Sequence, residues 1–291
     1  EFNRVMREHI TFGFVGIGLI GGSVAKALRR VYPSCKIIVY NRSAEPRVMA
    51  INDGTANVAV PQVNETFNEC DYIFLCTPVE KNVEYLKILK DIIKDDCIIT
   101  DVGSVKGNIH RAVKELGLEK NFIGGHPMAG SEKTSYTYAN DRLVENAYYA
   151  ITPTDAVSKE RVEEFTEIVQ GIGAIPINIS YEEHDKVVAT ISHLPHLIAA
   201  SLVNLVKHND SKKEYMKTMA AGGFKDITRI ASSSPEMWEQ ICAANPTAIS
   251  QLLGEYINSL TAVKEHIDSG DSHYIYKLFE EAGIYRNTFF G

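Results

Sequence analysis

One histidine of the chain stands in a segment of small and rigid residues. The sequence GGHPMAGSEK at 124–133 places His126 between a pair of glycines and a proline. A neutral imidazole, with an ordinary pKa of about 6.5, accepts protons near neutral pH, so His126 is a candidate general base. A surface turn is the simpler interpretation, because glycine and proline are common in loops. Other segments of the chain decide between the two.

A glycine pattern near the N-terminus indicates a dinucleotide-binding turn. FVGIGLIGGS at 14–23 contains Gly16-x-Gly18-x-x-Gly21 between an expected strand and an expected helix, which is the context that the pattern requires. Gly16 permits a tight turn, Gly18 lets a pyrophosphate approach the backbone, and Gly21 lets the helix pack closely on the strand. The helix N-terminus would face the phosphates.

The expected second strand ends without the acid that commonly binds the ribose 2′-hydroxyl of NAD. Asn41, Arg42 and Ser43 stand there instead. Asn41 can hydrogen-bond a diol, whereas Arg42 either attracts a 2′-phosphate or is a solvated surface charge. The sequence favours NAD and leaves NADP open. The candidate cofactor-binding residues belong to the glycine turn and to three strand ends: Gly16, Ile17, Gly18, Leu19, Ile20, Gly21, Asn41, Arg42, Ser43, Cys76, Thr77, Pro78 and Gly103.

The first 180 residues alternate β-rich runs with helical stretches. Strands are expected at 10–16, 36–41, 71–78, 97–104, 122–126, 146–153 and 174–180. Several early runs are apolar throughout, as in parallel strands that are covered on both faces. The pattern predicts an α/β domain with a Rossmann-type, doubly wound, mainly parallel sheet. The ends of its strands would bring Cys76, Gly103 and His126 to one crevice.

The β pattern disappears after Ser180, which predicts an all-helical second domain. Residues 181–208 predict a long helix or a pair of helices with a kink at Pro195. Apolar residues at steps of three and four from Ile249 to Ile267 predict an amphipathic helix that packs within the chain or on a partner subunit. We therefore expect a dinucleotide-binding domain at 1–180 and a helical domain at 181–291.

Charge and cysteine content limit the partners and the compartment. Thirty Lys and Arg against 37 Asp and Glu give a net charge of −7 with no basic run, which argues against nucleic acid and anionic membranes as partners. The chain has no run of about 18 apolar residues and no signal peptide at its start. The five cysteines form no C-x-x-C pair, which fits a cytoplasmic protein with reduced thiols and no zinc cluster.

Five segments in register resemble one enzyme family. GIGLIGGS, DVGSVKG (101–107), GGHPMAGSEK, SHLPH (192–196) and GGFKDITRIASSSPEMW (222–238) are together similar to the prephenate/arogenate dehydrogenase family of tyrosine biosynthesis. The resemblance implies NAD(P)-dependent oxidative decarboxylation, which gives 4-hydroxyphenylpyruvate from prephenate or tyrosine from arogenate. It also implies that the late helices form a homodimer. The acid that many NAD-using members carry is replaced by Asn41.

The resemblance assigns roles to individual residues. His126 matches the catalytic histidine that hydrogen-bonds the ring C4 hydroxyl, and Ser104 matches the serine beside it. Arg229 matches the arginine that binds a substrate carboxylate, for which a guanidinium offers a bidentate fork. The other implied substrate-binding residues are Ser131, Glu132, His184, Ser192, His196, Lys225 and Trp238.

Several alternatives stay open at this point. Ser104 suits the cap of a helix that begins at Val105. His193 and His196, near His184, invite a metal site, but Pro195 lies between them and no H-E-x-x-H pattern occurs, so we expect no metal. Another dehydrogenase with a Rossmann half and a helical half would use a lysine such as Lys186 as its base. A non-catalytic NAD(P)-sensing module would leave Ser104, His126 and Arg229 without a role.

Overall fold

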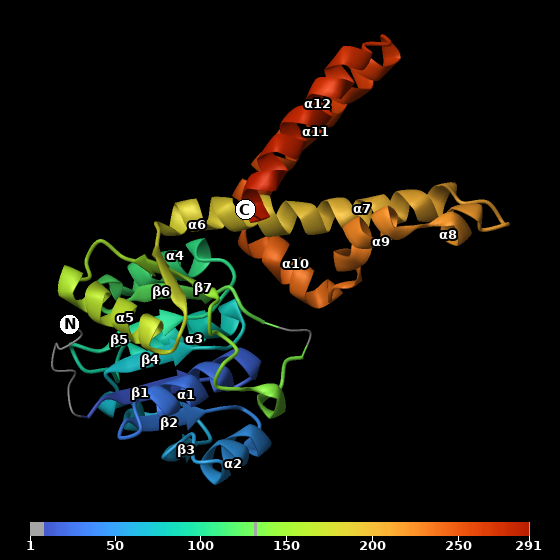
Figure 1. Cartoon of the computed structure of the whole chain (residues 1–291). Coiled ribbons are helices and arrows are strands. Elements are labelled where there is room, and N and C mark those ends of the chain that lie inside the picture. The colour runs from blue at the N-terminus through green and yellow to red at the C-terminus, as the bar shows by residue number, and fades with distance from the viewer. Residues whose placement is uncertain (1–8, 131–132, 291) are drawn as a thin grey trace. The chain divides into compact units, whose positions relative to one another are not determined.

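The computed structural model describes residues 9–130 and 133–290 of the chain. Its contacts divide the chain into two compact units, Glu1–Val188 and Ala189–Gly291. The first unit is built on β-sheets and the second contains helices (Figure 1). The division of the sequence at Ser180 stays a prediction.

Five parallel strands form the main sheet of the first unit, in the order β3-β2-β1-β4-β5. These strands are β1 (Thr11–Val15), β2 (Lys36–Tyr40), β3 (Val58–Val60), β4 (Tyr72–Leu75) and β5 (Ile98–Asp101). The chain order reverses between β1 and β4, whose ends pair at Val15 and Leu75. A crevice opens at such a switch point beyond the carboxyl ends of the strands, where open α/β sheets bind ligands. The predicted Rossmann-type fold is confirmed.

Three further strands extend this arrangement in a way that differs from a fully parallel sheet. β6 (Ile123–Pro127) pairs antiparallel with β7 (Tyr148–Pro153), and β7 pairs parallel with β8 (Ile175–Asn178). A parallel bridge from Ile99 to Phe122 connects β5 to the start of this second sheet. An antiparallel pair needs no helical crossover, and the only helix between β6 and β7 in the described residues is the short η3 (Tyr136–Tyr138).

Helices cover both faces of the main sheet (Figure 1). They are α1 (Leu19–Val31), α2 (Ala44–Asn52), α3 (Val79–Leu89), α4 (Gly107–Leu116) and α5 (Lys159–Gly171). The first unit also contains α6 (Tyr181–Val188), which packs on α4 and β7, and the short η1 (Glu65–Glu69) and η2 (Glu119–Asn121). One core contains Phe14, Phe74 and Phe165, and the other contains Leu75, Leu86 and Ile109. Burying each such side chain stabilises the fold by about 1.5–3 kcal/mol.

The second unit consists of helices. They are η4 (Ala189–His193), α7 (Leu194–Asn209), α8 (Tyr215–Met219), α9 (Gly222–Thr228), η5 (Arg229–Ser232), α10 (Pro235–Ala244), α11 (Pro246–Asp268), α12 (Ser272–Asn287) and η6 (Thr288–Phe290). α11 and α12 pack side by side as a hairpin (Figure 1). α11 confirms the predicted amphipathic helix, but only its first turns are buried, at Ile249 and Leu252.

The predicted long helix is interrupted before Pro195. η4 is a π-helical turn that ends at His193, and Pro195 stands in the first turn of α7. The helical run continues from α6 through η4 into α7, and proline, which has no N–H to donate, is accommodated where the π-turn alters the hydrogen-bond pattern. The irregularity at Pro195 therefore takes the form of a π-turn within one helical run.

The helical run Tyr181–Asn209 meets the length and composition of a membrane-spanning helix, with a mean hydropathy of 1.4 over 18 residues, of which 28% are buried. The apolar helices of water-soluble proteins meet the same criterion. Within this run, His184 and Asp185 are buried and hydrogen-bonded to groups of the α/β unit. These bonds hold the first residues of the helical run against β6 and the N-terminus of α4.

A buried histidine on α4 makes stability depend on pH. The His110 Nε2 lies 2.9 Å from Thr152 Oγ1, and its ring stacks on Tyr181. Burial lowers the pKa of His110 to about 4, although the nearby Asp101 opposes the shift. The folded pKa of His110 lies below its pKa in the unfolded chain. The fold therefore has the full stability that a neutral His110 allows above about pH 6.5. It is lost as the pH falls towards 4.

This histidine should remove about 2 kcal/mol from the free energy of unfolding between pH 7 and pH 5. In His110→Gln, an amide replaces the Nε2 position beside Thr152 and does not titrate. Urea unfolding at the two pH values should show a smaller loss for the variant than for the natural chain. Equal losses would contradict the assignment.

Candidate active site

The glycine turn has a shape that only glycine adopts without strain. Gly16 follows β1 with φ of +92°, and a Cβ at this position would lie 2.7 Å from Thr77 Cγ2. A Cβ on Gly21 would lie 2.5 Å from the Gly16 carbonyl oxygen. The backbone of α1 therefore packs directly on the turn, as the spacing predicted.

The N-terminus of α1 suits an anion. α1 begins at Leu19 and has no acidic side chain in its first turn, so the positive end of its dipole is not neutralised from within the helix. Leu19 N donates to the carbonyl oxygen of Thr134 at 3.0 Å. This bond joins the glycine turn to the segment that follows His126 in the sequence.

The end of β2 contacts the same turn. Asn41 Oδ1 accepts a hydrogen bond from Ile17 N at 3.2 Å, and Asn41 Nδ2 donates to the Ser43 carbonyl oxygen at 3.4 Å. Arg42 and Ser43 are exposed. The amide of Asn41 therefore holds the turn against the end of β2, and the side chain of Arg42 extends into solvent.

The loop after β4 is anchored by a residue that sequence reasoning missed. Asn82 Oδ1 accepts from Thr77 N at 3.2 Å and from Thr77 Oγ1 at 2.5 Å. Asn82 is fully buried in the first turn of α3. Burial also raises the pKa of the Cys76 thiol, which disfavours its thiolate form.

His126 lies on β6, opposite Ala150 of β7, and its side chain is half-buried. The two glycines before it allow close backbone packing. A Cβ on Gly124 would lie 2.2 Å from Thr152 Oγ1, and one on Gly125 would lie 2.6 Å from the Asp101 carbonyl oxygen. These glycines bring β6 against its neighbours, and the strand then holds the imidazole at its end.

A buried ion pair fixes the strand end beside His126. Lys106 Nζ bonds Asp101 Oδ2, and both side chains are 0% exposed. Lys106 Nζ also donates to the Gly125 carbonyl oxygen at 2.6 Å, while Gly125 N and Gly103 N donate to the Asp101 carboxylate. Burial lowers the pKa of Lys106, and Asp101 opposes this shift. Both residues belong to DVGSVKG, but their pairing did not follow from the sequence.

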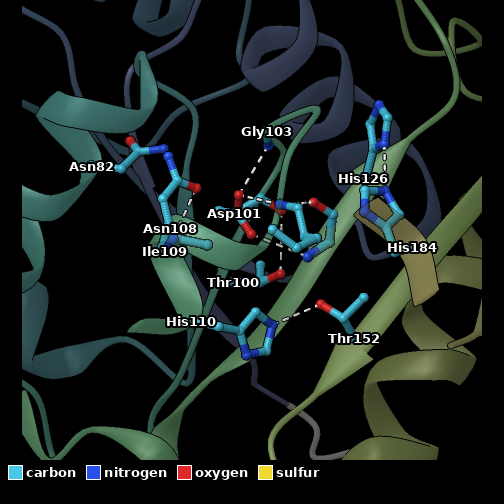
Figure 2. A network of polar contacts seen from close by, with 12 residues as sticks. Asn82, Thr100, Asp101, Gly103, Asn108, Ile109, His110, His126, Thr152 and His184 are labelled. Carbon is cyan, nitrogen blue, oxygen red and sulfur yellow. Dashed lines mark hydrogen bonds and ion pairs between the residues drawn. The ribbon is translucent and has the colours of Figure 1, made fainter. Parts of the chain in front are cut away.

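His126 contacts a second histidine from α6 (Figure 2). His126 Nδ1 lies 2.9 Å from His184 Nε2, and His184 Nδ1 lies 2.9 Å from Asp185 Oδ1. The rings of the two histidines meet edge to face, with centroids 5.1 Å apart. Asp185 in turn accepts from Lys106 N at 2.8 Å and Gly107 N at 2.7 Å.

The capping role considered for Ser104 is wrong. α4 begins at Gly107 rather than Val105, and its first amides are capped by the Asp185 carboxylate. A carboxylate from another element replaces the expected hydroxyl because α6 packs against α4. Ser104 is exposed in the loop between β5 and α4, which leaves its side chain available to a ligand.

The remaining predicted substrate residues gather in the helical unit. The His196 ring on α7 stacks on Trp238 of α10 at 4.0 Å between centroids, and His193 meets the same indole edge to face. The Ser192 carbonyl oxygen accepts from His196 Nδ1 at 2.7 Å, so the hydrogen of a neutral His196 lies on Nδ1. Trp238 Nε1 is buried without a hydrogen-bond partner in the described residues.

Two cationic residues stand at the end of α9 in the same unit. Lys225 and Arg229 are both exposed, and α9 and η5 pack against α7, which carries His196. Within residues 9–130 and 133–290, no group of three or more His, Cys, Asp or Glu side chains is arranged to hold a metal ion. The predicted Ser131 and Glu132 lie outside the described residues.

Two family profiles match the chain. Residues 24–178 match the prephenate dehydrogenase nucleotide-binding domain, and residues 180–281 match the prephenate dehydrogenase dimerization domain. Together these matches extend over most of the sequence and meet where the α/β segment gives way to helices.

Individual relatives agree with these matches. A prephenate dehydrogenase of Bacillus subtilis (strain 168) is 37% identical over 95% of this chain and 75% of its own length. A crystal structure of A. aeolicus prephenate dehydrogenase in complex with hydroxyphenyl propionate and NAD+ has a TM-score of 0.88 and 32% identity, covering 96% of this chain and 98% of that one. Synechocystis arogenate dehydrogenase has a TM-score of 0.90 and 27% identity, covering 96% of this chain and 100% of its own.

Proposed function

The chain belongs to the prephenate dehydrogenase family, and from this premise we propose that it oxidatively decarboxylates prephenate to 4-hydroxyphenylpyruvate with NAD. The observation that carries the proposal is a contact within the first unit between the glycine turn and the segment after His126. A glycine turn shaped for a dinucleotide is bonded to the segment that follows His126. This bond supports our proposal that a hydride acceptor on the turn and a proton acceptor at His126 act on one substrate.

The glycine turn supports NAD as the cofactor. Side chains at Gly16 and Gly21 would collide with the backbone or with Thr77, and the positive end of the α1 dipole favours the negative charge of a pyrophosphate. NAD, when bound, supplies the nicotinamide ring that accepts a hydride from C4 of the substrate. Asn41 is the group for the ribose hydroxyls, and the exposed Arg42 keeps NADP as a second cofactor to test.

His126 acts as the base for the C4 hydroxyl. Its imidazole takes the hydroxyl proton as the carbonyl forms, and the ring carboxylate then leaves as carbon dioxide. The electron pair of the broken C–C bond makes the ring aromatic, and the resulting phenolate oxygen takes the proton back from His126. A positioned base contributes about 10²–10⁴-fold to rate. Ser104, exposed beside β5, orients the hydroxyl. We do not assign Lys186 as the base. Its side chain is exposed, and the residue of α6 that contacts His126 is His184.

The helical unit supplies the groups for the acidic substrate. Arg229 binds a carboxylate, and the other residues of this unit that we assign to the substrate are Ser192, His196, Lys225 and Trp238. The sequence resemblance adds Ser131 and Glu132 of the first unit. The stacked His196 and Trp238 form a flat polar and aromatic wall. Because the Arg229 guanidinium is exposed, bringing it into contact with a dianionic substrate costs little free energy.

Arg229→Ala should raise KM for prephenate by roughly 10- to 100-fold, because a charge-assisted hydrogen bond contributes about 1.5–3 kcal/mol. Steady-state kinetics measure the effect, with the exposed Lys207→Ala of α7 as a matched control. Arg229→Lys keeps the charge without the fork and should be intermediate. A variant that unfolds would make Arg229 structural, and an unchanged KM would remove it from the site.

The helical unit also forms a homodimer. Its helices α11 and α12 expose large apolar side chains, which a partner subunit would remove from water: Ile257, Leu260, Tyr276, Phe279 and Tyr285. Twice the chain mass of 32.3 kDa should appear in light scattering.

The five unpaired cysteines favour the cytoplasm, which cell fractionation tests. We also propose a domain boundary near Ser180, which is supported by profile matches that end at residue 178 and begin at residue 180.

Absorbance at 340 nm tests the proposed activity. With prephenate and NAD, we expect NADH and an equal amount of 4-hydroxyphenylpyruvate. Arogenate is the second substrate to test, since Synechocystis arogenate dehydrogenase has a similar structure. A chain that reduces NAD only with simple hydroxyacids, or with no substrate, would contradict the proposal.

A further inference from the structure

We propose that His184 and Asp185 are positioning residues that place the hydrogen of neutral His126 on Nδ1 and leave Nε2 to accept the substrate proton. The inference rests on the proposed function, since it names the partners of the same base. It also changes the role of His184, which the sequence resemblance assigned to substrate binding. His184 is 1% exposed and contacts the half-buried His126 (Figure 2).

The first step concerns Asp185, whose two oxygens accept hydrogen bonds. Lys106 N and Gly107 N are backbone amides that can only donate, at 2.8 Å to Oδ1 and 2.7 Å to Oδ2. These amides form the N-terminus of α4, where the helix dipole stabilises a negative charge. Asp185 is therefore a carboxylate that accepts, and His184 Nδ1 donates to it at 2.9 Å.

The second step passes this constraint to His126. A neutral imidazole carries one hydrogen, so His184 with its hydrogen on Nδ1 has a bare Nε2. This Nε2 lies 2.9 Å from His126 Nδ1 and can only accept. The hydrogen of His126 therefore lies on Nδ1. Its Nε2 carries the lone pair that a general base needs.

The third step concerns the charged form of His126. When the substrate O–H bond breaks, a bond forms between the proton and His126 Nε2, and the ring becomes positive. Its Nδ1–H still donates to His184, which donates to the Asp185 carboxylate. The negative charge at the end of this chain stabilises the imidazolium. The same arrangement of carboxylate and imidazole orients histidine bases in hydrolases.

Two substitutions at one position separate this role from a structural one. In His184→Gln, the side-chain amide reaches the position of Nε2, so its oxygen can accept from His126 Nδ1. In His184→Asn, the amide stays at the position of Nδ1, so it keeps the bond to Asp185 and loses His126. A residue that only holds α6 on α4 should tolerate asparagine at least as well as glutamine.

We expect His184→Asn to lower kcat about 100-fold and His184→Gln to stay within about tenfold of the natural chain, within the range for a positioned base. KM for prephenate and the dissociation constant of NAD should change little in both. Thermal unfolding checks that each variant is folded. An asparagine variant as active as the glutamine variant would overturn the proposal, whether or not prephenate is the substrate of the natural chain.

A second measurement does not depend on turnover or on these variants. Long-range ¹H–¹⁵N correlation spectra of histidine-labelled protein report which nitrogen of each neutral ring carries the hydrogen, and His126→Asn assigns the signal. We expect His126 to carry its hydrogen on Nδ1 at a pH where the ring is neutral. A hydrogen on Nε2 would overturn the proposal. This spectrum together with an inactive natural chain would overturn only the proposed function.

Discussion

Replacing His126 with asparagine lowers kcat for prephenate oxidation by at least about two orders of magnitude. The asparagine amide lies near the position of the ring Nδ1, so it can keep the bond to His184 while Nε2 is removed. The base is then lost with little change in the surrounding packing. Stopped-flow and steady-state measurements of NADH formation give kcat directly.

Cofactor binding provides the control for this variant. The glycine turn lies on β1 and α1, so the dissociation constant of NAD, measured by fluorescence titration, should stay within about threefold. His208→Asn, at an exposed position on α7, is the matched histidine substitution and should leave kcat unchanged. An unchanged kcat in His126→Asn would remove this residue from the mechanism.

Replacing Lys106 with methionine lowers the free energy of unfolding by about 3–5 kcal/mol, the usual effect of removing one partner of a buried pair. Both Lys106 and Asp101 are 0% exposed, so the Asp101 carboxylate would stay buried without its cation. The loss also frees the Gly125 carbonyl oxygen beside His126. Urea unfolding measures the change.

Two further variants separate the buried pair from a general effect of losing a lysine. Lys264→Met breaks an exposed i,i+4 pair with Asp268 and should cost only about 0.3–0.5 kcal/mol. Adding Asp101→Asn to Lys106→Met removes the stranded charge and should recover part of the loss. If Lys106→Met costs no more than Lys264→Met, the buried pair does not stabilise this unit.

The sequence predicts the strands of the main sheet well because their signal is local. Strands buried on both faces require uninterrupted apolar runs, and β1, β2, β4 and β5 each lie inside an expected run. β3 was missed because its three residues at a sheet edge are too short to produce such a run. The glycine turn was predicted for the same local reason, since its spacing is read within ten residues.

The partners of His126 could not be predicted because they are distant in the sequence. His184 lies 58 residues after His126, and Asp185 caps amides 79 and 78 residues before it. A capping preference read from the sequence points to the nearest serine, Ser104, whereas packing of α6 on α4 brings a carboxylate instead. Here a tertiary contact from Asp185 provides the helix cap in place of a nearby serine. The same carboxylate, through His184, orients His126.

The most direct test of the account is a crystal structure of the chain with NAD and 4-hydroxyphenylpropionate, an unreactive analogue of the product. We predict His126 Nε2 within about 3 Å of the phenolic oxygen. The ring C4 should face the nicotinamide, and the Arg229 guanidinium should contact the carboxylate. An analogue bound with its hydroxyl away from His126, or with Arg229 and His126 on separate surfaces, would contradict the account.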